Sequence, residues 1–147
     1  MNFLFDTNVL LFYIRENALS AFIDATYNPF GEGNTPILSV VSVGEIKSIA
    51  LRNGWGKTKL TKLKELMALF VITDINVEEV IDAYAEIDTF SQGKLKTNPL
   101  PHSSRNMGKN DLWIAATASV ISAKLLTSDD DFDHLEGHYL DIIKIQP

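Results

Sequence analysis

Short apolar runs alternate along the chain with longer segments in which apolar residues recur every three or four positions. The short runs have the length of buried strands, whereas the longer segments have the period of amphipathic helices. We expect strands at 3–5, 36–39, 70–75, 125–127 and 142–145. We expect helices at 9–14, 18–25, 40–51, 57–69, 77–90 and 111–123, and a helical turn at 131–135. This alternation predicts an α/β sandwich around a mostly parallel central sheet.

Two local signals refine this outline. Asn76 directly precedes a helical pattern, and we expect its side chain to cap that helix. The segment 91–108 is polar, contains two glycines and two prolines, and has no usable period, so it predicts a long loop of the kind that is functional or mobile. No repeat or linker divides the chain, and 147 residues suit one domain, 1–147, with a substantial core.

The composition is that of a folded protein in a reducing compartment. Apolar residues make up 46% and charged residues 22% of the chain, and there is no cysteine, which excludes disulfides, thiolate metal sites and cysteine catalysis. Asp6 interrupts the first apolar run and no basic residue precedes it, so this run is not expected to be a secretory signal. No stretch is long enough to cross a bilayer, and we expect a cytoplasmic protein.

The net charge of −6 conceals a strong separation of charge along the chain. Ten of the 13 basic residues fall in two segments without acids: Lys47, Arg52, Lys57, Lys59, Lys62 and Lys64, and then Lys94, Lys96, Arg105 and Lys109. Either segment alone would be read as a solvated face. Because the two flank candidate acidic residues, they favour contacts with phosphate. The candidate nucleic-acid-binding residues are Lys57, Lys59, Lys94, Lys96, Arg105 and Lys109.

Four acids occupy positions that suggest a common site. Asp6 and Asp129 follow predicted strands, at the edge of a parallel sheet where ligands bind. Glu45 and Asp111 lie on the apolar faces of predicted helices. Each has an ordinary explanation by itself, such as a helix cap, a first-turn acid or a solvated loop. Together they would repel one another unless a hard divalent cation bound between them, which suits hydrolysis of a phosphodiester.

These residues resemble the PIN domain family, and its VapC-type toxin ribonucleases in particular. The resemblance rests on Asp6-Thr7-Asn8, on Glu45 in an apolar helix, on the segment 110–116 (NDLWIAA) and on the segment 126–132 (LTSDDDF), in this order. It implies a three-layer α/β/α sandwich with Mg²⁺ or Mn²⁺ as the cofactor. It further implies that the metal-binding acids are Asp6, Glu45, Asp111 and Asp129, with Asp131 as a fifth and with Thr127 and Asn8 in support.

The same resemblance implies a metal-dependent endoribonuclease that forms a homodimer and is inhibited by a small cognate antitoxin. An alternative is a PIN-like module that binds RNA or a protein partner without cutting. A haloacid-dehalogenase-type phosphatase would need a second aspartate where Asn8 stands. The remaining candidates are expected to be structural: His134 and His138 on the surface, Trp113 in the core, and Trp55 on a surface that stacks on a base or packs against another protein.

Overall fold

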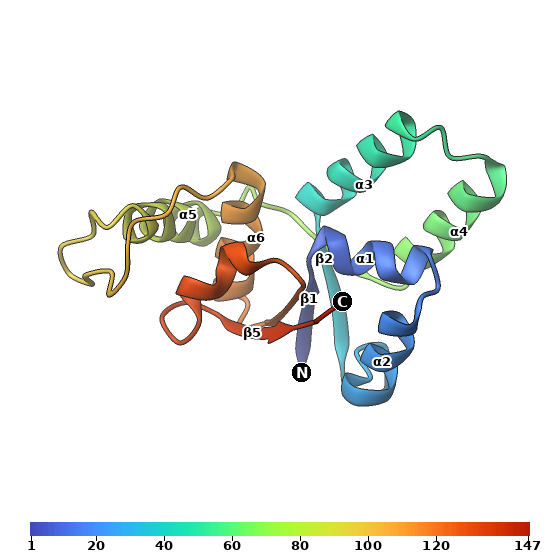
Figure 1. The fold of residues 1–147 in the computed structure, drawn as a ribbon, viewed down its shortest axis with the longest axis horizontal. Helices are drawn as coiled ribbons and strands as arrows, with labels where there is room; N and C mark the ends of the chain where they lie inside the picture. Colours follow the sequence, from blue (N-terminus) through green and yellow to red (C-terminus); the bar gives the residue numbers. More distant parts are fainter.

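Five parallel strands form the centre of the computed structural model, which describes residues 1–147 (Figure 1). The strands are β1 (Asn2–Phe5), β2 (Thr35–Ser39), β3 (Val71–Thr73), β4 (Lys124–Thr127) and β5 (Asp141–Lys144). The helices are α1 (Thr7–Ile14), α2 (Ala18–Tyr27), α3 (Val40–Arg52), α4 (Lys57–Met67), α5 (Glu78–Ser91), α6 (Lys109–Val120) and the short 3₁₀ helix η1 (Asp130–Leu135). The predicted α/β/α sandwich is confirmed, and every strand pair in its sheet is parallel.

The order of the strands places a crevice in the middle of the sheet. The order is β3-β2-β1-β4-β5, so the chain builds outward from β1 in one direction and then returns to add β4 and β5 on the other side. The two crossover directions therefore diverge between β1 and β4. Leu4 pairs with Leu125 and Phe5 with Leu126, which brings the carboxyl ends of these two strands side by side.

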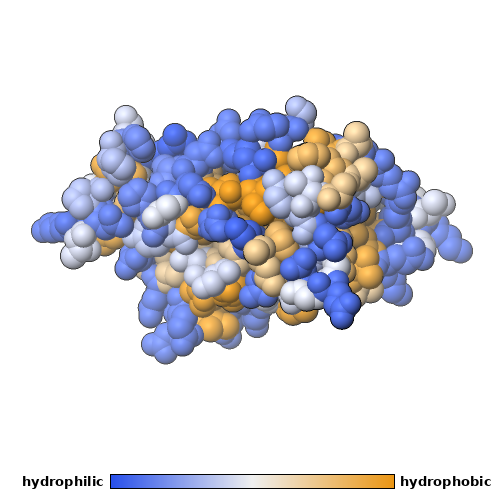
Figure 2. All heavy atoms as spheres, turned by 90° about the horizontal axis from the view of Figure 1, so that it is seen from below, coloured by the Kyte–Doolittle hydropathy of each residue, from blue (hydrophilic) through white to orange (hydrophobic).

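Both faces of the sheet are buried, because its strands are apolar at successive positions. Phe3 and Phe5 of β1 pack on one face with α1, α2, α3 and α4, whereas Leu4 packs on the other with α5, α6 and η1. Figure 1 shows these two helical layers on either side of the upright strands. Figure 2, seen from the edge at which β1 begins, shows hydrophobic side chains gathered along the middle and hydrophilic ones around them.

The chain departs from the sequence-based expectations at two local points. Asn76 does not cap α5: the helix begins after Val77, which has no capping oxygen, and the Asn76 N–H instead donates to Asp74 Oδ1 at 3.0 Å. His134 was expected on the surface, but it is only 5% exposed, because η1 turns it toward α5.

The segment between α5 and α6 is irregular, as predicted, and extends away from the sheet at the far end of the molecule (Figure 1). The loop ends at Gly108, the N-cap residue of α6. None of the helices combines the length and the apolar character that a membrane span requires.

Candidate metal centre

Asp6 lies at the point where the crossover directions diverge. Its backbone N–H donates to the Leu126 carbonyl at 3.0 Å, which continues the pairing of β1 with β4 by one residue. The carboxylate is 4% exposed and accepts two hydrogen bonds, from the Thr7 N–H at 2.8 Å and from the Thr127 hydroxyl at 2.8 Å. Asp6 therefore caps α1 and also presents a fixed, buried carboxylate at the carboxyl edge of the sheet.

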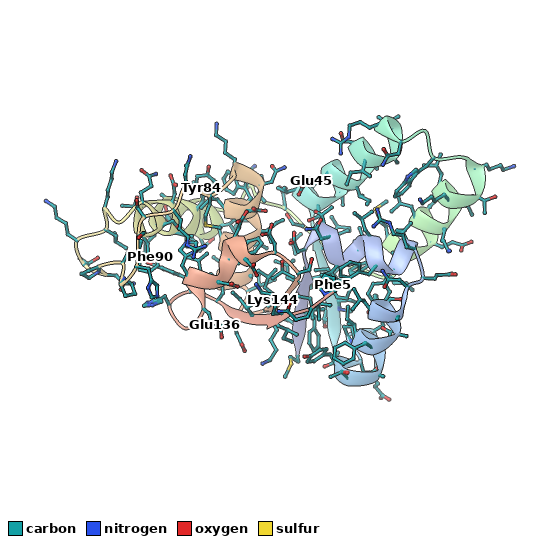
Figure 3. All side chains as sticks on the ribbon, viewed as in Figure 1. Phe5, Glu45, Tyr84, Phe90, Glu136 and Lys144 are labelled. Carbon is teal, nitrogen blue, oxygen red and sulfur yellow. The ribbon has the colours of Figure 1, made fainter.

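Glu45 reaches the same edge from α3. The helix begins directly after β2, so its second turn stands over the end of the sheet, where Figure 3 places Glu45. The Thr7 hydroxyl donates to Glu45 Oε1 at 3.0 Å, and Thr7 is itself only 4% exposed. One threonine thus connects the first turn of α1 with the carboxylate of α3.

Three further carboxylates gather beside Asp6. Oxygen atoms of Asp111, Asp129 and Asp131 all lie within 4.8 Å of one another. Asp111 projects from the first turn of α6, where the helix dipole favours a negative charge. Asp129 follows β4 and caps η1, and it accepts a hydrogen bond from the Asp131 N–H at 2.9 Å. The spacing of these three groups suits oxygen ligands around one cation.

This crowding contributes to raised pKa values of two of the carboxylates. Burial, together with repulsion from Asp129 and Glu45, raises the pKa of Asp6 to about 6. The two hydrogen bonds to its carboxylate act in the opposite direction, but they do not offset the burial. Burial also raises the pKa of Asp111 to about 7, and the charges of Asp6, Asp129, Asp131 and Glu45 add to the shift. The other four predicted acids therefore all lie close enough to Asp111 to act on it electrostatically.

Local basic side chains do not neutralise the cluster. Lys144 bonds to Asp130 at 2.7 Å and also to Asp133, so its charge is directed to the outer acids of η1. Its third hydrogen bond goes to the Asp129 carbonyl rather than to the Asp129 carboxylate. An oxygen-only, negatively charged donor set fits a hard divalent cation such as Mg²⁺ or Mn²⁺, because bound positive charge removes the mutual repulsion.

The structure assigns different surroundings to the predicted supporting residues. Thr127 is fully buried and links two acids: its hydroxyl donates to Asp6 and accepts from the Asp129 N–H at 3.0 Å. The Asn8 side chain is exposed on α1 and makes no hydrogen bond, so its role stays a prediction. Sequence reasoning overlooked Thr7, although a threonine directly after a strand-end aspartate was a usable signal.

The predicted basic residues fall in different parts of the molecule. Lys57 and Lys59 begin α4 at the outer end of the α3–α4 hairpin, where Lys59 Nζ lies 4.4 Å from the centre of the Trp55 ring. Lys94 and Lys96 lie on the long loop, on its exposed side. Arg105 and Lys109 lie nearer to the carboxylates, on the segment that leads into α6.

A groove of about 520 Å³ between α3 and α6 includes Glu45 in its lining. Glu45, Ser48 and Arg52 share one face of α3 and line it, and Asn110 and Trp113 line it from α6. Arg52 is thus the basic residue that shares a surface depression with a metal-cluster acid, and it was absent from the predicted binding set.

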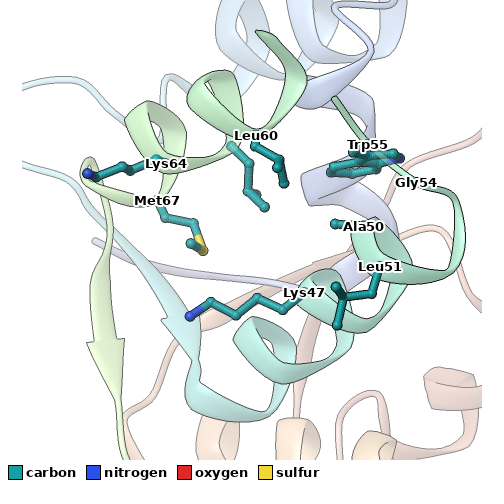
Figure 4. A pocket seen from close by; sticks show the side chains of 9 residues that line it. Lys47, Ala50, Leu51, Gly54, Trp55, Leu60, Lys64 and Met67 are labelled. Atoms are coloured by element: carbon teal, nitrogen blue, oxygen red, sulfur yellow. The ribbon is translucent and has the colours of Figure 1, made fainter. Parts of the chain in front are cut away.

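A second, more apolar groove of about 580 Å³ separates α3 from α4. Figure 4 shows Trp55 and Leu60 facing Ala50 across it, with Lys47 and Lys64 at its rim. Trp55 is half-buried here, which agrees with the expectation of a packing surface and places it away from the carboxylates.

Comparisons with known proteins agree with this architecture. The family model of the PIN domain matches residues 3–137. The chain resembles VapBC2 of Rickettsia felis bound to a promoter DNA fragment, with a TM-score of 0.77, 20% identity and 98% of each chain covered. It also resembles FitAcB of Neisseria gonorrhoeae, with a TM-score of 0.70, 22% identity and coverage of 97% of this chain and 96% of that one.

A third similar structure is VapBC-5 of Mycobacterium tuberculosis, with a TM-score of 0.65, 21% identity and 98% of each chain covered. No curated protein sequence matches the chain. The match to the family model covers most of the 147 residues, and the solved structures share the fold from end to end. The chain belongs to the PIN domain family.

Proposed function

We propose that this protein is a Mg²⁺- or Mn²⁺-dependent endoribonuclease, the toxin of a toxin–antitoxin pair. The observation that carries the proposal is the convergence of Asp6, Glu45, Asp111, Asp129 and Asp131 at the divergence point of the sheet. Isolated acids at the surface would need no common partner. Acids whose crowding raises the pKa of Asp6 and Asp111 at the carboxyl edge of a parallel sheet suit a site for a divalent cation and a phosphate.

Different residues of the chain have different roles in the proposed reaction. Asp111, Asp129 and Asp131 hold the cation, while Thr7 and Thr127 fix the rotamers of Glu45 and Asp6. When bound, a divalent cation lowers the pKa of water and polarises a phosphodiester oxygen. Asp6, a buried carboxylate beside the three acids that hold the cation, would take up the proton that an attacking water loses.

The RNA backbone lies along the groove between α3 and α6. Arg52 stands seven residues from Glu45 on the same helix face, which places the two Cα atoms about 10 Å apart along the axis. That separation exceeds the reach of one phosphate, so Arg52 would contact a phosphate next to the one that is cut. Arg105, whose charge acts on Asp130 of η1, and Lys109, the first residue of α6, would supply further phosphate contacts.

The direct test is cleavage of single-stranded RNA by purified protein in Mg²⁺, with Asp6→Asn as the variant and Asp82→Asn, an exposed acid on α5, as the matched control. Wild type and Asp82→Asn should cut, and Asp6→Asn or added chelator should abolish cutting. Equal cutting by Asp6→Asn would reveal a contaminating nuclease. Binding of RNA without cutting by any protein would support the alternative, a non-cleaving regulatory module.

An antitoxin partner is supported by the second groove. Solved structures that share this fold include complexes described as VapBC and as toxin–antitoxin assemblies. The apolar floor between α3 and α4, with Trp55 at one end and lysines at the rim, suits an amphipathic helix that carries acidic residues. Purification at natural expression levels should recover a small protein with wild type and lose it with Trp55→Glu.

A homodimer in the cytoplasm is the remaining part of the proposal. Val71 and Ile72 are 53% and 45% exposed on the edge strand β3. An exposed apolar edge of this kind favours association with a second copy. Light scattering of the purified protein at several concentrations should give twice the mass of the chain, and Ile72→Lys should lower it to that of the chain.

A further inference from the structure

Ser91, Met107 and His134 form a buried polar contact outside the metal centre. Ser91 is the last residue of α5, Met107 precedes α6, and His134 lies on η1. All three are at most 7% exposed. The Ser91 hydroxyl oxygen lies 2.7 Å from His134 Nε2, and the hydroxyl donates to Met107 Sδ at 3.3 Å. The three side chains thus join the two ends of the long loop to η1.

The hydrogen bonds of this contact define the protonation of His134. When the Ser91 hydroxyl donates to Met107 Sδ, His134 Nε2 carries the ring proton and donates it to the Ser91 oxygen. His134 Nδ1 is then a buried acceptor without a partner. A proton on Nδ1 would also lack a partner, and burial together with the charge of Arg105 lowers the pKa of His134. The neutral ring is therefore the form that the contact requires.

The backbone closes the loop at the same place. The Arg105 N–H donates to the Ser91 carbonyl at 2.7 Å, so the segment 92–106 leaves and re-enters the fold next to one residue. This segment carries Lys94, Lys96 and Arg105 and no acid. The hydrogen bond and the charge of Lys144 lower the pKa of Asp130 on η1, and the charge of Arg105 lowers it further. Arg105 therefore lies close to η1.

The metal ligands do not depend on this contact for their positions. Phe132 and Leu135 anchor η1 in the core with no exposed surface, and Lys144 binds its outer acids. Asp111 is placed by α6, half of whose residues are buried. Loss of the Ser91–His134 hydrogen bond should therefore release the loop while the carboxylates stay in place.

We propose that Ser91 and His134 are positioning residues that hold the loop 92–106 against η1, so that its basic side chains contact the RNA backbone beside the carboxylates. This inference rests on the proposed function, because its ligand is RNA. A loop that is held in advance loses less conformational freedom when RNA binds, and the contact therefore strengthens binding more than it accelerates cutting.

The first measurement needs no RNA. Hydrogen exchange of the Arg105 amide and its neighbours should be at least about tenfold faster in Ser91→Ala and His134→Ala than in wild type. Ser103→Ala, which changes an exposed serine of the same loop, should exchange as wild type does. His134→Gln, which places an amide nitrogen near the position of Nε2, should restore much of the protection. Unchanged exchange in Ser91→Ala and His134→Ala would overturn the inference.

The second measurement is cleavage of a mixed-sequence single-stranded oligoribonucleotide in Mg²⁺. KM should rise about three- to tenfold in Ser91→Ala and His134→Ala, with kcat within about twofold of wild type, and His134→Gln should recover part of the KM. Faster loop exchange with unchanged KM would overturn the role in RNA binding. Failure of the proposed function would be seen separately, as absence of cleavage by the wild-type protein.

Discussion

The hydroxyl of Thr127 donates a hydrogen bond to the carboxylate of Asp6 across 121 positions of the chain, at 2.8 Å. The same oxygen accepts from the Asp129 N–H at 3.0 Å, so one side chain sets the separation of two acids from opposite ends of the sequence. The contact is possible because β1 and β4 are neighbours in the sheet. The geometry of the metal centre is therefore coupled directly to the pairing of these strands.

Replacement of Thr127 by valine should weaken the metal centre without changing its shape. Valine has nearly the same volume, but it removes the hydrogen bond that stabilises ionised Asp6 and leaves the Asp129 N–H without its acceptor. We expect a loss of about 1–3 kcal/mol in the free energy of unfolding and several-fold weaker Mg²⁺ binding. Urea denaturation and Mg²⁺ titration measure the two effects.

Thr117→Val is the matched control for this substitution. Thr117 is also buried, at 1% exposed, and its hydroxyl donates to the Trp113 carbonyl at 2.8 Å within α6. The Thr117→Val variant should change the free energy of unfolding, but its affinity for Mg²⁺ should equal that of wild type. Equal loss of Mg²⁺ affinity in both variants would argue that Thr127 acts through general stability.

The metal-free protein should become less stable as the pH rises toward neutrality. The pKa of Asp111 is about 7 in the fold and 3.8 as the reference value, so the folded state binds more protons than the unfolded state between these values. The free energy of unfolding therefore falls as the pH rises from about 4 to about 7, and the contribution present at low pH is lost above about 7. Asp111→Asn should remove the larger part of this dependence, and the raised pKa of Asp6, about 6, should leave a smaller dependence of the same sign.

At pH 8 without metal, Asp111→Asn should unfold at higher urea concentration than wild type. The expected gain is on the order of 1–2 kcal/mol, once solvent screening at this half-buried position reduces the full linkage value. Near pH 4 the two proteins should converge. Asp82→Asn, at an exposed position of α5, should show no comparable gain, and a gain of equal size there would contradict a local origin.

Divalent cations should stabilise the protein most strongly at high pH. Ionised carboxylates bind Mg²⁺, and protonated ones do not, so the shift of the melting temperature in Mg²⁺ should be large at pH 8 and small at pH 5. Asp111→Asn should lose most of the shift. A shift of equal size at both pH values would indicate that the cation binds elsewhere.

Arg52 and Lys57 provide a test of the RNA path with equal changes in charge. Arg52 lines the groove that contains Glu45, whereas Lys57 lies at the outer end of the α3–α4 hairpin. Arg52→Ala should raise KM for RNA about three- to tenfold and reduce the dependence of binding on salt, because one phosphate contact is removed. Lys57→Ala should change KM by less than about twofold. The reverse order would place the RNA on α4.

The sequence alone supported the sheet, the helices and the five acids. Apolar runs such as Phe3–Phe5 encode a strand that is buried on both faces, and this signal does not depend on tertiary contacts. Each acid had an ordinary explanation by itself, and the four stood out because they occurred together at strand ends and on apolar helix faces. The family motifs then connected them in order along the chain.

Other features depended on contacts between distant segments, which periodicity does not encode. His134 follows four acids, Asp129, Asp130, Asp131 and Asp133, and it is buried against Ser91, which lies 43 residues away. In the sequence, Arg52 is one of several basic residues near the end of α3. It lines a groove only because α6 lies beside α3 in the fold. Asparagine is a common capping residue, but the Asn76 N–H donates to the Asp74 side chain and α5 begins only after Val77.

The pairing of β1 with β4 has a consequence for synthesis of the protein. Asp6 is translated well before Asp111, Asp129 and Asp131. A nascent chain therefore holds an incomplete set of carboxylates until β4 can insert beside β1. The cluster of acids is complete only in a chain whose β1 and β4 have paired.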